Sequence, residues 1–400
     1  MKLRNFMYAT MIACAFASCS NDDVIENGPD AKGDASLTIK IDTKGTKAYG
    51  SGDETINELA VFLYKVTGEE SQTKTLAGHE YVASNYNNGQ IVFEGLTAGD
   101  KYMCVGFANL GDVSEAQATG TNPILLSISE GLYEATDVPM HGISTVVTIK
   151  ANEDTEATIN LYRDLAKVEL ESVVLNMNYV LDDERYGDYS AGTAKFQFLS
   201  ASVNSAAQAT SYKYSNAGTV TDFTNATTFV GGLGNTWKWG ELTNTGSAIT
   251  GYKIAPTSAL AEATQLIGDK DAATENKDGY DAKTVAKPSS VVFYVLPNTT
   301  ADDKTTLTLE GKMTLENAVK GQQTINNVVT GFYNIEIGKD ANAAEGSSYE
   351  AGSGVHANDY FKISVIVVGT GDGVGGEQPK LIVKTTVAKW NEISQTTPVK

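Results

Sequence analysis

The chain of 400 residues is poor in cysteine and histidine, and each shortage excludes a class of protein. Only Cys104 among its three cysteines lies beyond the first 19 residues, so the sequence predicts a fold without disulfide bonds. Cys104 stands in an apolar run at residues 102–107, which indicates a packed thiol rather than a reactive one. The three histidines, at positions 79, 141 and 356, have no spacing typical of a zinc site.

Basic residues are also few, with 30 Lys and Arg against 49 Asp and Glu and a net charge of −19. A chain this acidic is repelled by nucleic acid and by anionic membrane surfaces, so neither is an expected partner. The acidic residues are spread along the chain rather than gathered in one tail, which indicates a role in solubility.

Motifs for catalysis or cofactor binding are missing as well. Residues 371–376 match G-x-G-x-x-G, but the strand-like run that follows predicts a hairpin loop instead of a dinucleotide site. The aspartates in the 269–281 loop lack the spacing of an EF-hand. No G-x-S-x-G is present and no cysteine has a partner histidine, so we expect neither a cofactor nor an enzyme.

The start of the chain carries a lipoprotein-like export signal. Lys2 and Arg4 precede an apolar run from about residue 6 to residue 16, which is too short to span a bilayer. Small residues at Ala17 and Ser18 then suit cleavage just before Cys19. This pattern predicts that Cys19 is lipidated and that the protein travels to the outer membrane, with an ordinary secretory signal as the alternative.

The remaining chain is dominated by runs of alternating apolar and polar residues, which predict an all-β fold. Residues 36–42 alternate most clearly, with Leu37, Ile39 and Ile41 on one face of a strand. Short helices are expected only at residues 122–130 and 258–267. We predict two β-sandwich domains with Greek-key-like connections.

The domain boundaries follow from shifts in the pattern. We expect a signal peptide at residues 1–18 and a flexible tether at 19–35, followed by an N-terminal domain at 36–162 and a C-terminal domain at 163–400. The last boundary is placed where Arg163 and Asp164 interrupt an apolar run.

Several segments, in order, resemble the major fimbrial subunits (fimbrillins) of Bacteroidales, which build type V pili. Residues 36–43, 46–54 and 59–64 look like the opening of that family, and residues 161–168 look like the start of its second domain. The close, Val387-Ala-Lys-Trp390, is similar to the Val-Ala-x-Trp ending of the family. The further segments that carry the resemblance are residues 97–102, 105–109, 292–298 and 358–365.

The resemblance implies two transthyretin-like domains and a structural role in a cell-surface fimbria. It also implies that a surface trypsin-like protease cuts the lipoprotein precursor after a basic residue, which is Lys47 before Ala48, with Lys44 as second choice. The first strand, with Leu37, Ile39 and Ile41, would then leave.

The resemblance further implies that a strand from the C-terminal region of another copy or of an accessory pilin fills the groove. That region is about 380–400, with Ile393 and Val399 as candidate donor residues. The fibre would support adhesion and biofilm, and a host or bacterial surface ligand could be a further partner.

Two other roles stay open from the sequence. The chain could be an anchor or tip subunit of the same pilus. It could also be a glycan-binding surface lipoprotein, for which Trp237 and Trp239 on one predicted strand are the specific support.

Overall fold

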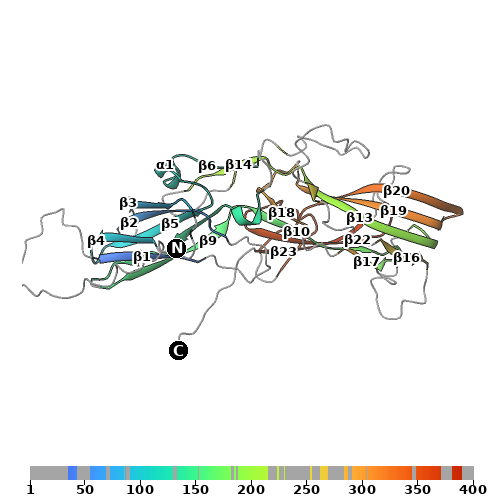
Figure 1. Cartoon of the computed structure of the whole chain (residues 1–400), viewed down its shortest axis with the longest axis horizontal. Coiled ribbons are helices and arrows are strands. Elements are labelled where there is room, and N and C mark those ends of the chain that lie inside the picture. Colours follow the sequence, from blue (N-terminus) through green and yellow to red (C-terminus); the bar gives the residue numbers. More distant parts are fainter. Residues whose placement is uncertain are drawn as a thin grey trace, which may run out of the picture.

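The computed structural model shows an elongated, mainly β molecule with one sheet at one end and two further sheets toward the other (Figure 1). The structure describes residues 35–42, 55–68, 73–84, 86, 91–128, 133–151, 153–181, 184–185, 188–214, 223–224, 229, 253–254, 262–268, 283–286, 291–302, 304–344, 348–370 and 381–389. The all-β prediction is confirmed. No helix in this part of the chain has the length and apolar character needed to cross a membrane.

The first sheet has the strand order β3-β2-β5-β7-β9-β1-β4, and β8 pairs with β5. Its strands alternate between buried and exposed side chains wherever one face meets water, as expected for a half-buried sheet. The bounds are β1 Ala35–Asp42, β2 Leu59–Thr67, β3 Thr73–Val82, β4 Ile91–Leu96, β5 Lys101–Ala108, β7 Met140–Ser144, β8 Val147–Thr148 and β9 Thr155–Arg163.

This sheet curls around a core of its own. The Phe93 ring on β4 lies against Gly78 on β3, where an added Cβ would stand 3.2 Å from the ring. The two edge strands therefore face each other, and glycine at position 78 permits the approach. Inside lies the barrel core, a separate cluster formed by Ala35, Leu37, Ile39, Leu59, Val61, Leu63, Tyr86, Ile91, Phe93, Leu96, Tyr102, Cys104, Ala108, Met140, Ile149, Ala157, Ile159 and Leu161.

Two larger sheets make up the second half. One has the order β17-β10-β22-β23-β21, with β18 on β10, and the other has the order β15-β13-β19-β20, with β16 on β13. The bounds are β10 Ala166–Leu175, β13 Ala191–Asn204, β15 Lys253–Ile254, β16 Ala263–Ile267, β17 Lys283–Ala286, β18 Val292–Val295, β19 Thr306–Lys320, β20 Gln323–Glu336, β21 Asn342–Ala343, β22 Asp359–Val367 and β23 Leu381–Lys389.

A second core cluster joins both halves. It contains Phe62 of β2 and Phe107 of β5, on the face of the first sheet opposite the barrel core, together with Phe196 and Phe361 of the second half. The strands β2 and β5 are thus buried on both faces, which explains their nearly continuous apolar sequences. The predicted boundary between residues 162 and 163 lies at the end of β9 of the first sheet, just before the turn that leads to β10 of the next sheet.

Several smaller elements complete the fold, and α1, β6 and β14 lie along one side of the molecule, above the first sheet in the view of Figure 1. The helix α1 spans Glu115–Ala118 and the 3-10 helix η1 spans Ala135–Asp137, while β6 Ile124–Ser127 pairs with β14 Ala209–Tyr212 from the second half. A short hairpin consists of β11 Val180–Leu181 and β12 Glu184–Arg185.

Both helix predictions are wrong where the structure describes those residues. In residues 122–130 the strand β6 forms, because Ile124 and Leu126 are buried while Leu125 is 71% exposed, a period of two. In residues 258–267 the strand β16 forms, and it pairs with β13. In both places strand pairing and the burial of alternate side chains stabilise the strand by more than the intrinsic helix propensity of the residues stabilises a helix.

Candidate functional site: the groove of the first strand

The strand β1 is an internal strand of the first sheet, with neighbours on both sides. It pairs antiparallel with β4, with Leu37 opposite Phe93 and Ile39 opposite Ile91. On its other side it runs parallel to β9 from Leu37 to Asp42. The backbone groups of β1 therefore serve two ladders, and removal of β1 would leave one unpaired edge on β4 and another on β9.

The inward face of β1 is held by apolar packing. Leu37 and Ile39 are fully buried in the barrel core, and the half-buried Ile41 packs against it. Burial of the two fully covered side chains stabilises the strand by roughly 3–6 kcal/mol, at about 1.5–3 kcal/mol each. The sequence prediction that these three residues share one face agrees with their alternating burial.

The outward face of β1 adds only weak polar contacts. Lys40 Nζ lies 2.7 Å from Glu156 Oε2, but both side chains are about half exposed. Ser36 Oγ donates to Asp154 Oδ1 at 3.1 Å. Ion pairs in such exposed settings contribute about 0–1 kcal/mol, so the apolar face determines how firmly β1 is held.

Cys104 lies in the same core as β1. Its side chain on β5 has no exposed surface, and burial raises the pKa of its thiol far above the ordinary value. The thiol therefore stays protonated and unreactive while the barrel is closed. The predicted packing role of Cys104 is consistent with this position.

A polar cluster around Asp164 lies where the two halves of the molecule meet. The carboxylate of Asp164, fully buried in the turn after β9, contacts His141 Nδ1 through Oδ1 and accepts a hydrogen bond from Tyr212 Oη at 2.9 Å through Oδ2. Burial, and then the neighbouring Asp164, raise the pKa of Tyr212 well above its usual value. The sequence signal for this cluster is the interruption of the apolar run at Arg163 and Asp164.

The residues around β14 act as a strap across the first sheet. Tyr214 Oη donates to the Gly142 carbonyl at 3.4 Å, and its ring meets Phe107 edge to face with centroids 5.3 Å apart. Together with the β6–β14 pairing and the Tyr212–Asp164 bond, these contacts join the first sheet to the second half independently of β1. This strap was not predicted from the sequence.

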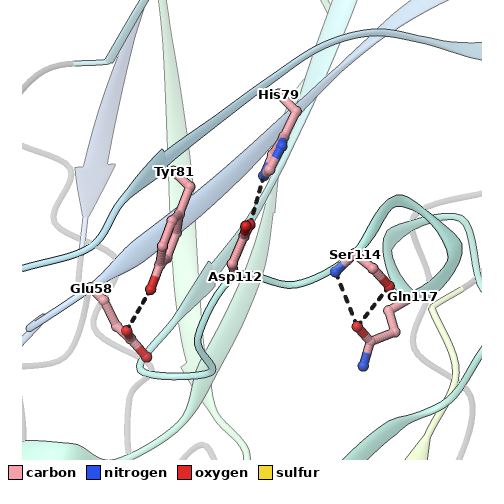
Figure 2. Close-up of polar contacts among 6 residues, drawn as sticks. All are labelled: Glu58, His79, Tyr81, Asp112, Ser114 and Gln117. Carbon is pink, nitrogen blue, oxygen red and sulfur yellow. Dashed lines mark hydrogen bonds and ion pairs between the residues drawn. The ribbon is translucent and has the colours of Figure 1, made fainter.

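A third group of side chains fixes the loop after β5 (Figure 2). Glu58 accepts hydrogen bonds from Tyr81 Oη at 2.8 Å and from the Gly111 amide at 2.5 Å. His79 Nε2 lies 3.6 Å from Asp112 Oδ1, and its ring stacks on Phe62 with centroids 4.2 Å apart. Both Glu58 oxygens are engaged in holding the loop against β2 and β3.

The same loop leads into α1 through a local cap. Ser114 donates from its amide to Gln117 Oε1 at 3.0 Å and from its hydroxyl at 2.8 Å (Figure 2). The cap satisfies groups at the start of a helix that is only one turn long. These contacts place the loop and offer no open position for a reacting group.

The other sequence-predicted residues lie outside the described ranges. These are the lipidation residue Cys19, the cleavage residues Lys44, Lys47 and Ala48, the donor candidates Ile393 and Val399, the pair Trp237 and Trp239, residues 371–376 and the aspartates of the 269–281 loop. The three histidines belong to separate contacts with Asp112, Asp164 and Ser353. Within the described ranges, no three His, Cys, Asp or Glu side chains gather as a metal site.

Comparison with known proteins shows which protein family this β-rich chain resembles. Residues 35–178 match the model of a family described as major fimbrial subunit protein (FimA). The matched range starts at the first residue of β1 and contains the whole first sheet, so it includes the groove. The resemblance to fimbrillins predicted from the sequence is thereby confirmed, and the match supports a role in a cell-surface fimbria.

Three solved structures match this chain at low sequence identity. A Parabacteroides distasonis protein assigned to cell adhesion is 16% identical, with 89% of this chain and 99% of that chain covered and a TM-score of 0.48. A Porphyromonas gingivalis fimbrilin is 16% identical, with 91% of this chain and 100% of that chain covered and a TM-score of 0.47. The C-terminally truncated tip fimbrial protein Mfa3 of the same species is 9% identical, with 89% of this chain and 100% of that chain covered and a TM-score of 0.35. No curated protein matches the chain.

Proposed function

We propose that this protein is a pilin, a structural subunit of a cell-surface fimbria that polymerises by donor-strand exchange and is not an enzyme. The observation that carries the proposal is β1, an internal strand that packs in a core of its own and precedes the rest of the fold. The family match over residues 35–178 supports it. Residues 36–162 form the acceptor unit in this proposal, and residues 163–400 form the donor unit.

The precursor is lipidated at Cys19 and exported to the outer membrane. A surface protease of trypsin-like specificity then cuts between Lys47 and Ala48, with Lys44 as the second site. Both lysines lie in the segment between the end of β1 at Asp42 and the start of β2 at Leu59. A cut in this segment severs β1 from the chain and leaves β1 and β2 themselves intact.

Loss of β1 creates the acceptor groove. The neighbouring strands β4 and β9 would each present unpaired N–H and C=O groups, and the sockets of Leu37 and Ile39 would be empty. Such an edge is a strong template for the addition of an extended strand. An incoming strand with apolar residues at alternate positions recovers the same roughly 3–6 kcal/mol, before the cost of its ordering.

The donor comes from the C-terminal region, about residues 380–400, of another subunit. In the free chain β23 pairs with β22 along nine residues, so its detachment would cost that ladder. The proposal therefore places the donor residues after β23, at residues 390–400. Ile393 and Val399 are an even number of residues apart, so a strand containing them presents both to one face.

Limited proteolysis tests the maturation step. Trypsin treatment of the purified precursor should yield a product that starts at Ala48 by N-terminal sequencing, followed by ladders on unboiled gels. The variant Lys47→Ala should slow this cut strongly, because trypsin requires a basic residue before the cleaved bond, whereas the matched control Lys44→Ala should leave it unchanged.

Deletion of residues 391–400, which leaves β23 intact, tests the donor step. The shortened chain should be cut normally but should no longer form ladders. A processed chain that stays monomeric with its C-terminus present would contradict the proposal. Resistance to the cut together with retained lipid would instead indicate an anchor subunit.

A further inference from the structure

The long strand β20 is an edge strand of its sheet among the strands that the structure describes. It pairs with β19 on one side and ends the strand order β15-β13-β19-β20 (Figure 1). Along an edge strand, every second residue points its N–H and C=O groups away from the sheet. The outer edge of β20 is thus a long row of backbone groups that face away from β19. Among the residues of β20, Val328 donates from its amide to Asn327 Oδ1 at 2.8 Å, so this amide already has a partner within the chain.

Apart from Glu336 at its end, β20 lacks the charged residues and prolines that usually block pairing at an edge strand. Residues 321–335 contain no charged residue and no proline, although one fifth of the chain is charged. By contrast, the edge strand β3 contains Lys74 and Glu80, and the edge strand β4 contains Glu94. Charges and prolines on edge strands normally prevent pairing with another molecule. Their absence marks β20 as a surface for strand pairing.

An apolar side chain stands near the middle of this edge strand. Val328 is 58% exposed, and Thr324, Asn326 and Thr330 lie exposed on the same face. This row is uncharged and mixes small polar groups with a β-branched residue, a composition that suits cross-strand contacts.

We propose that β20 pairs antiparallel with β20 of a second copy of this chain. Charge permits this partner, because two chains of net charge −19 repel each other wherever acidic segments meet but can approach along residues 321–335, which carry no charge. An antiparallel pair of identical strands has twofold symmetry, so the contact closes as a dimer. With Val328 at the axis, Val328 meets its own copy and Asn326 meets Thr330, without any like-charge pair.

This pairing is distinct from donor-strand exchange, because it uses the other end of the molecule and no cleavage. If subunits polymerise as proposed above, the contact repeats along the fibre, and many weak pairs would bind two fibres side by side. The test of the pair itself does not depend on that step, because the unprocessed chain contains the complete β20.

Lysine substitutions provide a matched pair of variants. Val328→Lys on β20 and Leu266→Lys on β16 lie on the same sheet, at 58% and 59% exposure, so their effects on folding should be alike. Sedimentation of the full-length protein should show a concentration-dependent dimer. Val328→Lys should raise its dissociation constant about tenfold or more by placing two ammonium groups opposite each other. Leu266→Lys should leave it unchanged.

Single cysteines at positions 326, 328 and 330 then locate the twofold axis. Under mild oxidation, dimer cross-linking should peak at one position and fall on either side, because only the residue at the axis opposes its own copy. The unsubstituted chain sets the background, and Leu266→Cys should not exceed it. A protein that stays monomeric, equal effects of the two lysines, or cross-linking at background in all three positions would overturn the proposal.

Discussion

Ile39→Ala lowers the unfolding free energy of the precursor by about 2–5 kcal/mol and leaves the processed subunit unchanged. The loss of about 2–5 kcal/mol in the precursor is the usual cost of removing a large apolar side chain from a packed core, and Ile39 has no exposed surface. The stability of the processed subunit should not change, because that subunit no longer contains β1. Denaturant titration of both forms, before and after cleavage at Lys47, measures the two differences.

The matched control is Thr38→Ala on the same strand. Its side chain points away from the barrel core and is only half-buried, so the precursor should change by no more than about 0.5 kcal/mol. If Ile39→Ala destabilised the processed form as much as the precursor, β1 would still be bound after cleavage, and the proposed exchange would be wrong.

Asp164→Ala should have a comparably large effect through a different mechanism. The substitution removes a fully buried carboxylate and leaves both His141 and the Tyr212 hydroxyl without it. Each buried polar group that loses its partner costs about 1–3 kcal/mol, so the loss of both contacts should cost about 2–6 kcal/mol. Tyr212→Phe removes one hydrogen bond from the same carboxylate and should cost about 1–3 kcal/mol. Chemical denaturation of the full chain measures both.

An exposed aspartate provides the comparison for this cluster. Asp112 is also near a histidine, but its side chain is 62% exposed, so Asp112→Ala should change stability by no more than about 0.5 kcal/mol. The double variant with Asp164→Ala and Tyr212→Phe should cost less than the sum of its parts, because the two groups share one interaction. Additive costs would show that the strap and the Asp164 turn are independent.

The strap explains how the chain could lose a strand and stay folded. The barrel core contains β1, whereas the cluster that joins the first sheet to the second half contains no residue of β1. The contacts of Tyr212 and Tyr214 belong to this second set. Cleavage would therefore open one core and leave the other closed, which a pilin that waits for a donor strand requires.

The sequence predicts the parts of this architecture that depend on short-range pattern. The alternation of Leu37, Ile39 and Ile41 locates β1 within one residue of its observed start, because one face of the strand is buried and the other meets water. Helix-forming residues such as those before Ala263 mislead, because pairing with β13 decides the conformation there.

Long-range contacts could not be read from the sequence. The approach of Tyr212 to Asp164 joins residues 48 positions apart, and no local periodicity encodes it. The contact between Gly78 and the Phe93 ring is also not encoded locally, because it forms only when the sheet curls and brings β3 against β4. The interruption of an apolar run at Arg163 and Asp164 was the single local sign of the junction, and it indicated a boundary rather than a polar cluster.

Mass spectrometry of the assembled polymer tests the exchange of β1 most directly. Ladders formed after cleavage would be purified, dissolved in denaturant and weighed. The exchange predicts one species per subunit that starts at Ala48, with no peptide containing residues 35–42. A peptide with Leu37 and Ile39 present at one copy per subunit would contradict it, because β1 would then still occupy the groove.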